Sequence, residues 1–239
     1  MNQYSLHNIL FLDIETVPQY SAYDEMPDEW KSLWNIKAGY LIRNPEEETF
    51  ETIYPRAGIY AEFGKIICIT CGVISGNGDG KKITLKSFYG DNEAVLLTEF
   101  SDMMKKWAAN EQKCLCAHNG KEFDFPYLCR RMVIHQLPIP SILNIAGKKP
   151  WEISHLDTME LWKFGDYKSY TSLNLLAHTL GIPTPKDDID GSKVWEVYWQ
   201  EKNIRRIVDY CQKDVITVAQ VFLRLHNETL IKSENIELK

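Results

Sequence analysis

Apolar and polar positions alternate along the chain in a pattern that predicts strands followed by helices. The first apolar run, residues 9–14, is broken by Asp13 and predicts a buried strand that ends in polar side chains. Two later β-rich runs flank residues 76–80, a Gly-Asn-Gly-Asp-Gly segment that is typical of a hairpin turn. Strands are therefore expected at residues 9–14, 66–74, 83–89, 114–117 and 153–156.

Apolar residues recur at helical spacing between and after these strands. In the longest such segment, residues 203–225, Ile204, Ile207 and Cys211 fall on one stripe, which predicts an amphipathic helix. The polar tail after Leu230 is expected to fray. A hairpin followed by alternating strands and helices predicts an α/β fold, in which helices flank a mixed sheet. Further helices are expected at residues 93–108, 125–136 and 172–180.

Residues 16–60 interrupt this alternation directly after the first strand. The segment is irregular, contains several Trp and Tyr residues, and carries an acidic patch at residues 46–48. A connection of about 45 residues is too long for a plain loop, so we expect an insert with short helices of its own, one of them near residues 28–34. We expect residues 1–239 to form one domain that this insert decorates.

Composition and charge narrow the class of protein. Hydrophobic residues make up 44% of the chain, enough for a large core, and the formal net charge is −6. Proteins that hold nucleic acid by overall charge are usually basic, so a nucleic-acid role here would depend on a local site. No apolar run approaches the roughly 18 residues of a membrane span, and no basic start of a signal peptide is present. We therefore expect a cytoplasmic protein without membrane contact, whose cysteines are free thiols.

Four carboxylates and a tyrosine form the strongest candidate site. Asp13 and Glu15 lie two residues apart at the end of the first strand, so both side chains point to the same face of the sheet, where like charges repel unless a cation lies between them. Asp124 lies between a strand and a helix. Tyr210 and Asp214 share a face of the long helix. Each signal alone also fits an ordinary strand end, a helix cap or a solvated helix face.

Taken together, these side chains can converge at one edge of a mixed sheet. Four carboxylates there favour a cage for two divalent cations, and oxygen ligands favour Mg²⁺ or Mn²⁺. Such a pair of ions stabilises the attacking and leaving oxygens of a displacement at phosphorus. Tyr210, one turn from Asp214, is placed to orient the attacking water, whereas a pKa near 10 argues against a role as sole base. Asp157, which also follows a strand, is expected to be a strand-end cap rather than a fifth catalytic carboxylate.

Three short motifs resemble, in chain order, those of a known superfamily. The segments Asp13-Ile14-Glu15-Thr16, Asn119 with Phe123-Asp124, and Tyr210 with Asp214 resemble the exonuclease motifs of the DEDD superfamily in its tyrosine subtype. The second motif is most similar to the proofreading domain of family B DNA polymerases and its free-standing bacterial relatives. The resemblance, over about residues 9–222, implies a ribonuclease H-like fold and a 3′–5′ exonuclease that releases nucleoside monophosphates from DNA, with single-stranded ends preferred.

The resemblance also implies roles for individual residues. Asp13 would bridge two divalent cations, Glu15 and Asp214 would complete the ion that activates water, and Asp124 would hold the second ion largely through waters. Contacts to the nucleic-acid strand are implied for Asn119 and Phe123, while Thr16 would support the metal ligands, and Phe123 or Leu12 would pack against the last bases. Core packing is an equally good interpretation of Phe123.

Two alternatives remain open. The tyrosine subtype also includes ribonucleases, so the same mechanism acting on RNA is the first alternative, and DNA is favoured by the wording of the second motif. The second alternative is a non-catalytic module on the same fold that binds nucleic acid or protein, with residues 16–60 as the surface for a protein partner. Strand preference, pathway and oligomeric state do not follow from the sequence.

Overall fold

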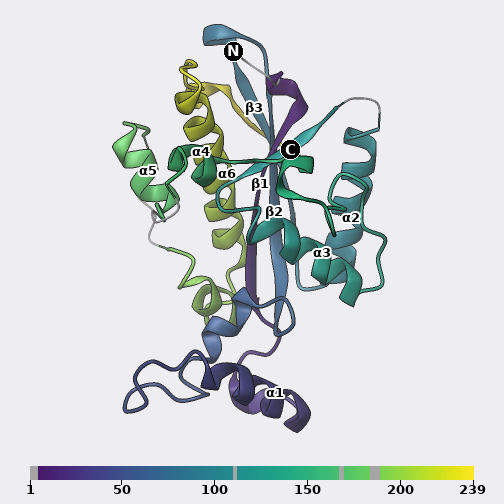
Figure 1. Ribbon diagram of the computed structural model, residues 1–239, viewed down its shortest axis with the longest axis vertical. Coiled ribbons are helices and arrows are strands. Elements are labelled where there is room, and N and C mark those ends of the chain that lie inside the picture. Colours follow the sequence, from purple (N-terminus) through teal and green to yellow (C-terminus); the bar gives the residue numbers. More distant parts are fainter. Residues whose placement is uncertain (1–4, 110–111, 167–169, 184–188) are drawn as a thin grey trace.

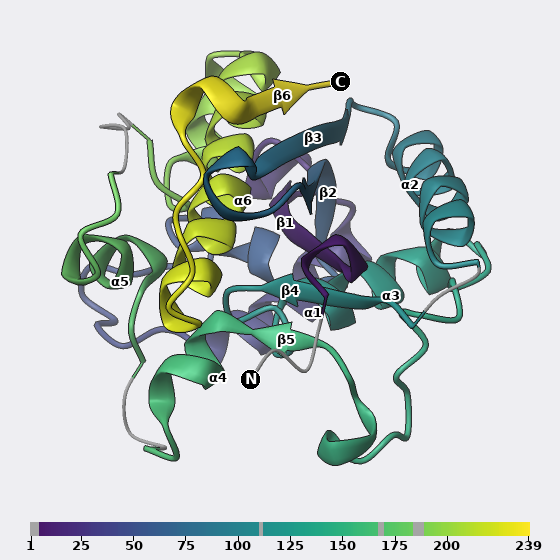
Figure 2. The same cartoon turned by 90° about the horizontal axis from the view of Figure 1, so that it is seen from above.

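The computed structural model describes residues 5–109, 112–166, 170–183 and 189–239. Its centre is a mixed six-stranded sheet in the order β5-β4-β1-β2-β3-β6 (Figures 1 and 2). β1, β2 and β3 are antiparallel neighbours, β4 lies parallel to β1, β5 parallel to β4, and β6 parallel to β3. The strands are β1 Ile9–Pro18, β2 Gly64–Ser75, β3 Lys82–Tyr89, β4 Cys114–Ala117, β5 Leu156–Asp157 and β6 Ile236–Leu238.

Helices cover both faces of this sheet, with α2 and α3 on one face and α6 on the other (Figure 1). The period-two alternation of β1 decides the direction of each side chain: Leu10 and Leu12 join the core under α2 and α3, whereas Ile9 and Phe11 join the core under α6. No helix in the described part of the chain has the length and apolar character to cross a membrane. The helices are α1 Asp28–Gly39, α2 Glu93–Trp107, α3 Asp124–Ile134, α4 Thr158–Lys163, α5 Leu173–Thr179 and α6 Ile204–Leu225.

The carboxyl half of β1 leaves the ladder that it shares with β4. The last β4 partner of β1 is Cys116, which lies opposite Phe11, while the pairing with β2 continues to the end of β1. The start of α3 takes the place beside β1 that β4 vacates, and there the Asp124 Oδ1 accepts a hydrogen bond of 3.2 Å from the Ile14 N–H. This edge therefore joins the end of the first strand to the start of a helix 110 residues later.

The insert between β1 and β2 has an aromatic core of its own at the lower end of the sheet in Figure 1. α1 and a 3₁₀ helix, Tyr54–Ile59, enclose Trp34, whose indole N–H donates to the Phe50 carbonyl over 2.9 Å. The 3₁₀ helix lies against β1, where a Cβ on Gly58 would come within 3.0 Å of the Val17 backbone. A glycine is required there because the two backbones touch. The prediction of short helices within the insert is confirmed.

The C-terminal tail is ordered, so the prediction that it frays after Leu230 is wrong. The Gln220 side chain of α6 binds the Ile231 backbone twice, accepting from its N–H at 2.9 Å and donating to its carbonyl at 2.7 Å. β6 then extends the sheet beside β3. β6 is an edge strand, in which Ile236 packs against the core and the two residues after it are exposed.

Candidate active site

β1 changes from apolar to acidic along the face that packs against α6. Ile9 and Phe11 are fully buried on that face, and the next two positions of the same alternation are Asp13 and Glu15. Glu15 is only 7% exposed. Burial is the main cause that raises the pKa of both carboxyl groups, and repulsion from neighbouring carboxylates raises each pKa further.

Asp124 is the first residue of α3, and its carboxylate reaches β1. The N-cap position of α3 is occupied by Phe123, and the Asp124 carboxylate instead accepts from the Ile14 N–H. Burial raises the pKa of Asp124 to about 7, and the charges of Asp157 and Asp214 act in the same direction. The carboxyl group is therefore tied to β1 and held among other acids.

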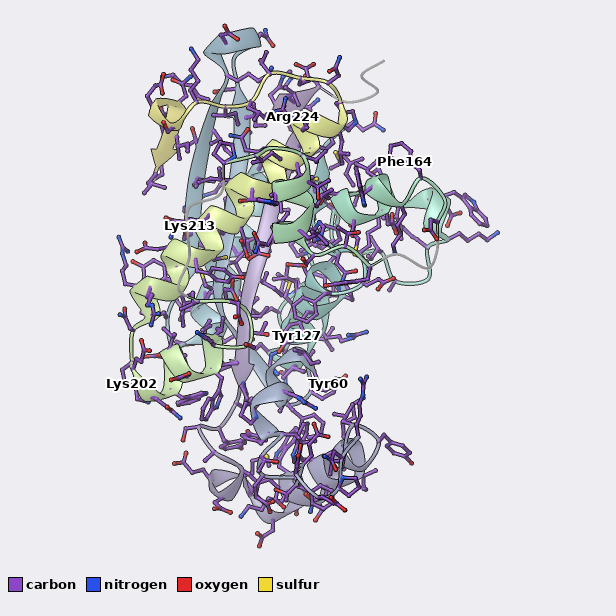
Figure 3. The ribbon with its side chains drawn as sticks, turned by 90° about the vertical axis from the view of Figure 1, so that its left-hand side faces the viewer. Tyr60, Tyr127, Phe164, Lys202, Lys213 and Arg224 are labelled. Carbon is purple, nitrogen blue, oxygen red and sulfur yellow. The ribbon has the colours of Figure 1, made fainter. Side chains whose placement is uncertain are left out.

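α6 brings Tyr210 and Asp214 to the same place. The Tyr210 hydroxyl hydrogen-bonds the Asp214 carboxylate, and burial together with the nearby carboxylates raises the pKa of Tyr210 well above its ordinary value. One residue after the tyrosine, the Cys211 thiol donates to the Asp13 Oδ2 over 3.3 Å. Figure 3 shows α6 beside β1, with Lys213 on the far side of β1 from Tyr127.

The donor set at this place fits divalent cations. Ligand atoms of Asp13, Glu15 and Cys211 all lie within 4.8 Å of one another, and the charges of Asp124 and Asp214 reach the same carboxylates. Carboxylate oxygens are the ligands that Mg²⁺ and Mn²⁺ prefer. Burial raises the pKa of the Cys211 thiol, so this group stays protonated and serves as a hydrogen-bond donor to Asp13. Carboxylates that are this close and buried repel one another, and a cation bound between them would remove that repulsion.

Two residues that support this site were not among the candidates from the sequence. Cys211 belongs to the apolar stripe of the long helix, and that pattern carries no sign of its contact with Asp13. Asp157 is the N-cap of α4, as expected, but its carboxylate also accepts from the N–H groups of Asn119 (3.0 Å) and Lys121 (3.1 Å). It therefore holds the loop of the second motif in place.

The remaining candidate residues, Asn119, Phe123 and Thr16, differ in their exposure and contacts. Asn119 has a left-handed backbone (φ 63°), and its buried Oδ1 has no hydrogen-bond partner among the described residues. Phe123 is partly buried, with its ring 5.3 Å from that of Tyr127. Thr16 follows a shift of register after Glu15 and is partly exposed. Asn119 thus has an unpaired but buried acceptor, and Phe123 keeps part of its side chain exposed.

Leu12 differs from the other candidates. Its side chain is fully buried in the core under α2 and α3, on the face of the sheet opposite to Asp13. The cause is the same alternation that brings Asp13 and Glu15 together, because the residue between Phe11 and Asp13 must point the other way. Leu12 offers no surface to a base, so we correct its assignment from strand contact to core residue.

The chain resembles a group of nucleases in sequence. Residues 59–235 match the model of a family described as a predicted 3′-5′ exonuclease related to the exonuclease domain of PolB. This range includes Asp124, Tyr210 and Asp214, whereas Asp13 and Glu15 precede it. No curated protein sequence matches the chain.

The fold is similar to that of a solved family B DNA polymerase from the hyperthermophilic archaeon Pyrobaculum calidifontis, with a TM-score of 0.52 at 14% sequence identity. The alignment covers 90% of this chain and 24% of the polymerase chain, so this chain spans about a quarter of the polymerase's length. The similarity confirms the expected ribonuclease H-like α/β fold. Because the matched residues 59–235 make up well over half of the sequence, the chain belongs to the family of predicted 3′-5′ exonucleases related to the exonuclease domain of PolB.

Proposed function

We propose that this chain is a metal-dependent 3′–5′ exonuclease that removes nucleoside monophosphates from the 3′ end of DNA and prefers single-stranded ends. The observation that carries the proposal is the convergence of four carboxylates from β1, α3 and α6 on one buried place beside Tyr210. Protein interiors do not keep several like charges together without a counter-charge, which supports two divalent cations at this place. Membership of the exonuclease family supports the same activity.

Asp13, Glu15 and Asp214 are proposed to hold one cation, and Asp13 with Asp124 the other. When bound, two such ions lower the pKa of water and stabilise the charge on the attacking and leaving oxygens of a phosphodiester. The contribution of the chain is to position the carboxylates beforehand. The Ile14 N–H orients Asp124, and the Cys211 thiol orients Asp13.

Tyr210 is proposed to orient the attacking water. Burial and the neighbouring carboxylates raise its pKa, so the hydroxyl of the metal-free chain stays protonated and acts as a hydrogen-bond donor. Its proton lies in the hydrogen bond to Asp214, so its oxygen is left to accept a hydrogen bond from water. This gives Tyr210 a positioning role in which its loss lowers the rate without removing the metal ligands.

Asn119 and Phe123 are proposed to receive the 3′-terminal nucleotides. Asn119 has an unused acceptor, and the partly exposed ring of Phe123 offers a stacking surface. Thr16 is proposed to support the ligands from the position after Glu15. The preference for DNA rests on the similarity of the second motif to family B polymerases. Residues 1–239 are proposed to be one exonuclease domain, with residues 16–60 as its decoration.

Digestion of 5′-labelled single-stranded DNA and of RNA with the same sequence tests this proposal, with Mg²⁺, with Mn²⁺ and with EDTA. The expected result is a ladder that shortens from the 3′ end, depends on metal, and forms faster on DNA. Asp13→Asn should abolish the ladder, whereas Asp209→Asn, at an exposed aspartate of α6, should retain it.

Two other outcomes would replace the proposal. A faster ladder on RNA would make the chain an exoribonuclease with the same site. Metal binding by calorimetry without cleavage of either strand would leave a non-catalytic module on the exonuclease fold.

A further inference from the structure

A cavity of about 300 Å³ lies between the start of β2, the turn after β3 and the segment that precedes α6. Lys65 is the second residue of β2 and pairs with Val17 of β1, which lies two residues beyond Glu15. In Figure 3 Lys202 lies on the far side of β1 from Tyr127. The cavity is lined by Lys65, Asp91, Tyr198, Trp199, Lys202 and Ile204, and the carboxylate site uses none of them.

Two ammonium groups share one aromatic ring in this cavity. Lys65 Nζ lies 4.9 Å from the centre of the Trp199 ring, and Lys202 Nζ lies 4.8 Å from it. Burial is the main cause that lowers the pKa of Lys65, the charges of Asp91 and Glu93 oppose this shift, and the charge of Lys202 adds to it, so the two ammonium groups repel each other. A cation–π contact at an exposed site contributes only about 0.5–1 kcal/mol. The indole therefore positions the lysines without cancelling their repulsion.

The nearest acid is not in direct contact with either ammonium group. Lys65 Nζ donates to the Tyr198 hydroxyl over 2.9 Å, and that hydroxyl donates to the Asp91 carboxylate over 2.6 Å. The hydroxyl thus lies between the charges, and within the described ranges neither lysine makes a salt bridge. Among the residues that line the cavity, one carboxylate faces two ammonium groups, so the lining carries a net positive charge.

The walls of the cavity are anchored rather than loose. A π-helix, Glu196–Gln200, presents Tyr198 and Trp199 with their rings edge to face at 4.9 Å. The Trp199 indole N–H donates to the Pro18 carbonyl at the end of β1 over 3.1 Å. π-helical turns are rare and frequently occur at functional sites. The ring that both lysines contact is therefore fixed before any ligand binds, which lowers the entropic cost of binding.

We propose that this cavity binds a phosphate group between Lys65 and Lys202. A phosphate supplies the negative charge that two adjacent ammonium groups lack, and its oxygens accept hydrogen bonds from both. Two sources share this chemistry: a backbone phosphate of a nucleic-acid strand, and a free nucleoside monophosphate. The proposal does not rest on the exonuclease activity, because the cavity is separate from the carboxylates and binding is measurable without turnover.

Binding in EDTA tests the proposal with the full chain. Calorimetry measures inorganic phosphate and AMP, and fluorescence anisotropy measures a 5′-fluorescein-labelled single-stranded oligonucleotide over a series of salt concentrations. The variants are Lys202→Gln and Lys65→Gln, and the matched control is Lys106→Gln, at an exposed lysine on α2. Circular dichroism establishes that each variant is folded.

For a phosphate site, both cavity variants should weaken phosphate or oligonucleotide binding about tenfold relative to the control. A decrease of about 0.7 in the salt slope of oligonucleotide binding per lysine removed would assign the backbone of a strand. Lost AMP binding with an unchanged oligonucleotide slope would assign a free nucleotide. Equal binding by the cavity variants and Lys106→Gln in every arm would overturn the proposal and leave the two lysines as packing residues of Trp199.

Discussion

Two clusters of buried charge lie on opposite faces of the sheet, and they are balanced differently. Under α2 and α3, the Glu93 carboxylate accepts from Arg131 Nε (2.9 Å) and from the Ile66 N–H (2.7 Å), and it meets His135 Nε2 at 2.7 Å. Under α6, the Asp13 carboxylate meets the Cys211 thiol and the charges of other aspartates. Glu93 is therefore paired with the positive charge of Arg131, whereas the groups around Asp13 include other carboxylates.

This difference separates a structural cluster from a functional one. A buried acid that is paired with a guanidinium is stable when it is ionised, and removal of either partner is costly. A cluster of buried acids is unfavourable until a cation binds. We therefore expect Glu93 to stabilise the folded chain, and the four carboxylates beside Tyr210 to destabilise it whenever metal is absent. Four predictions test this contrast, from the largest effect to the smallest.

Asp214→Asn should separate activity from stability most strongly. It removes a proposed metal ligand, so kcat should fall by at least about 10³-fold, because a metal contributes several kcal/mol to the transition state. The same change relieves repulsion with Asp13 and Glu15, so the thermal midpoint in EDTA should stay equal or rise. Rates from the digestion assay and melting curves check both parts. A variant that loses activity and stability together would place Asp214 in the structural class.

Stability in EDTA should fall as the pH rises from about 4 to about 7. An acid whose pKa is raised by folding binds its proton more tightly in the native state. It therefore adds stability that is complete below its unfolded value of 3.8 and is lost as the pH passes its folded value, which is about 7 for Asp124. The full change for this group is roughly 4 kcal/mol.

Urea unfolding of the wild type and of Asp124→Asn between pH 4 and pH 8 measures this effect. The asparagine keeps an acceptor for the Ile14 N–H but does not titrate. The stability of this variant should therefore change less with pH than that of the wild type. Parallel curves for the two proteins would contradict the prediction.

Glu93→Gln should destabilise the chain by about 3 kcal/mol, because Arg131, which is 3% exposed, keeps its charge and loses its counter-ion. Urea unfolding measures the loss, and Glu99→Gln, at an exposed site on the same helix, is the matched control. Activity per folded molecule should be unchanged. A variant as stable as the control would show that the α2–α3 face does not depend on this ion pair.

Mg²⁺ or Mn²⁺ should stabilise the wild type, by about 2.7 kcal/mol at a concentration one hundred times its Kd. The gain should be absent in Asp13→Asn and intact in Glu93→Gln, because only the first change touches the proposed ligands. Melting curves with and without metal test this difference. Equal stabilisation of both variants would place the metal elsewhere on the protein.

Local features of this fold were predictable because they depend on backbone geometry alone. The two-residue period of a strand put Asp13 and Glu15 on one face, and the helical period put Tyr210 and Asp214 on one face. The same rule applied to Leu12 would have sent it to the opposite core, where the structure places it. The tail was misjudged because the polar pattern of an edge strand differs little from that of a frayed end.

Contacts between distant segments were beyond such rules. The hydrogen bond from Ile14 to Asp124 spans 110 residues, and that from Cys211 to Asp13 spans 198. The residue types do not predict these contacts, because a cysteine on an apolar stripe and an aspartate at a helix start are also common in proteins without a metal site. The pairing of β1 with β4 ends at Phe11, and the start of α3 reaches β1 beyond that point.

The sequence by itself determined the acidic and aromatic residue types, their order along the chain and the face of the strand or helix on which each lies. The tertiary structure decided that these faces meet, that the Cys211 thiol donates to Asp13, and that two lysines share the ring of Trp199. The physical reason is that periodicity follows from the geometry of a single strand or helix, whereas the meeting of separate elements depends on how whole layers pack and on which sheet edge is left open.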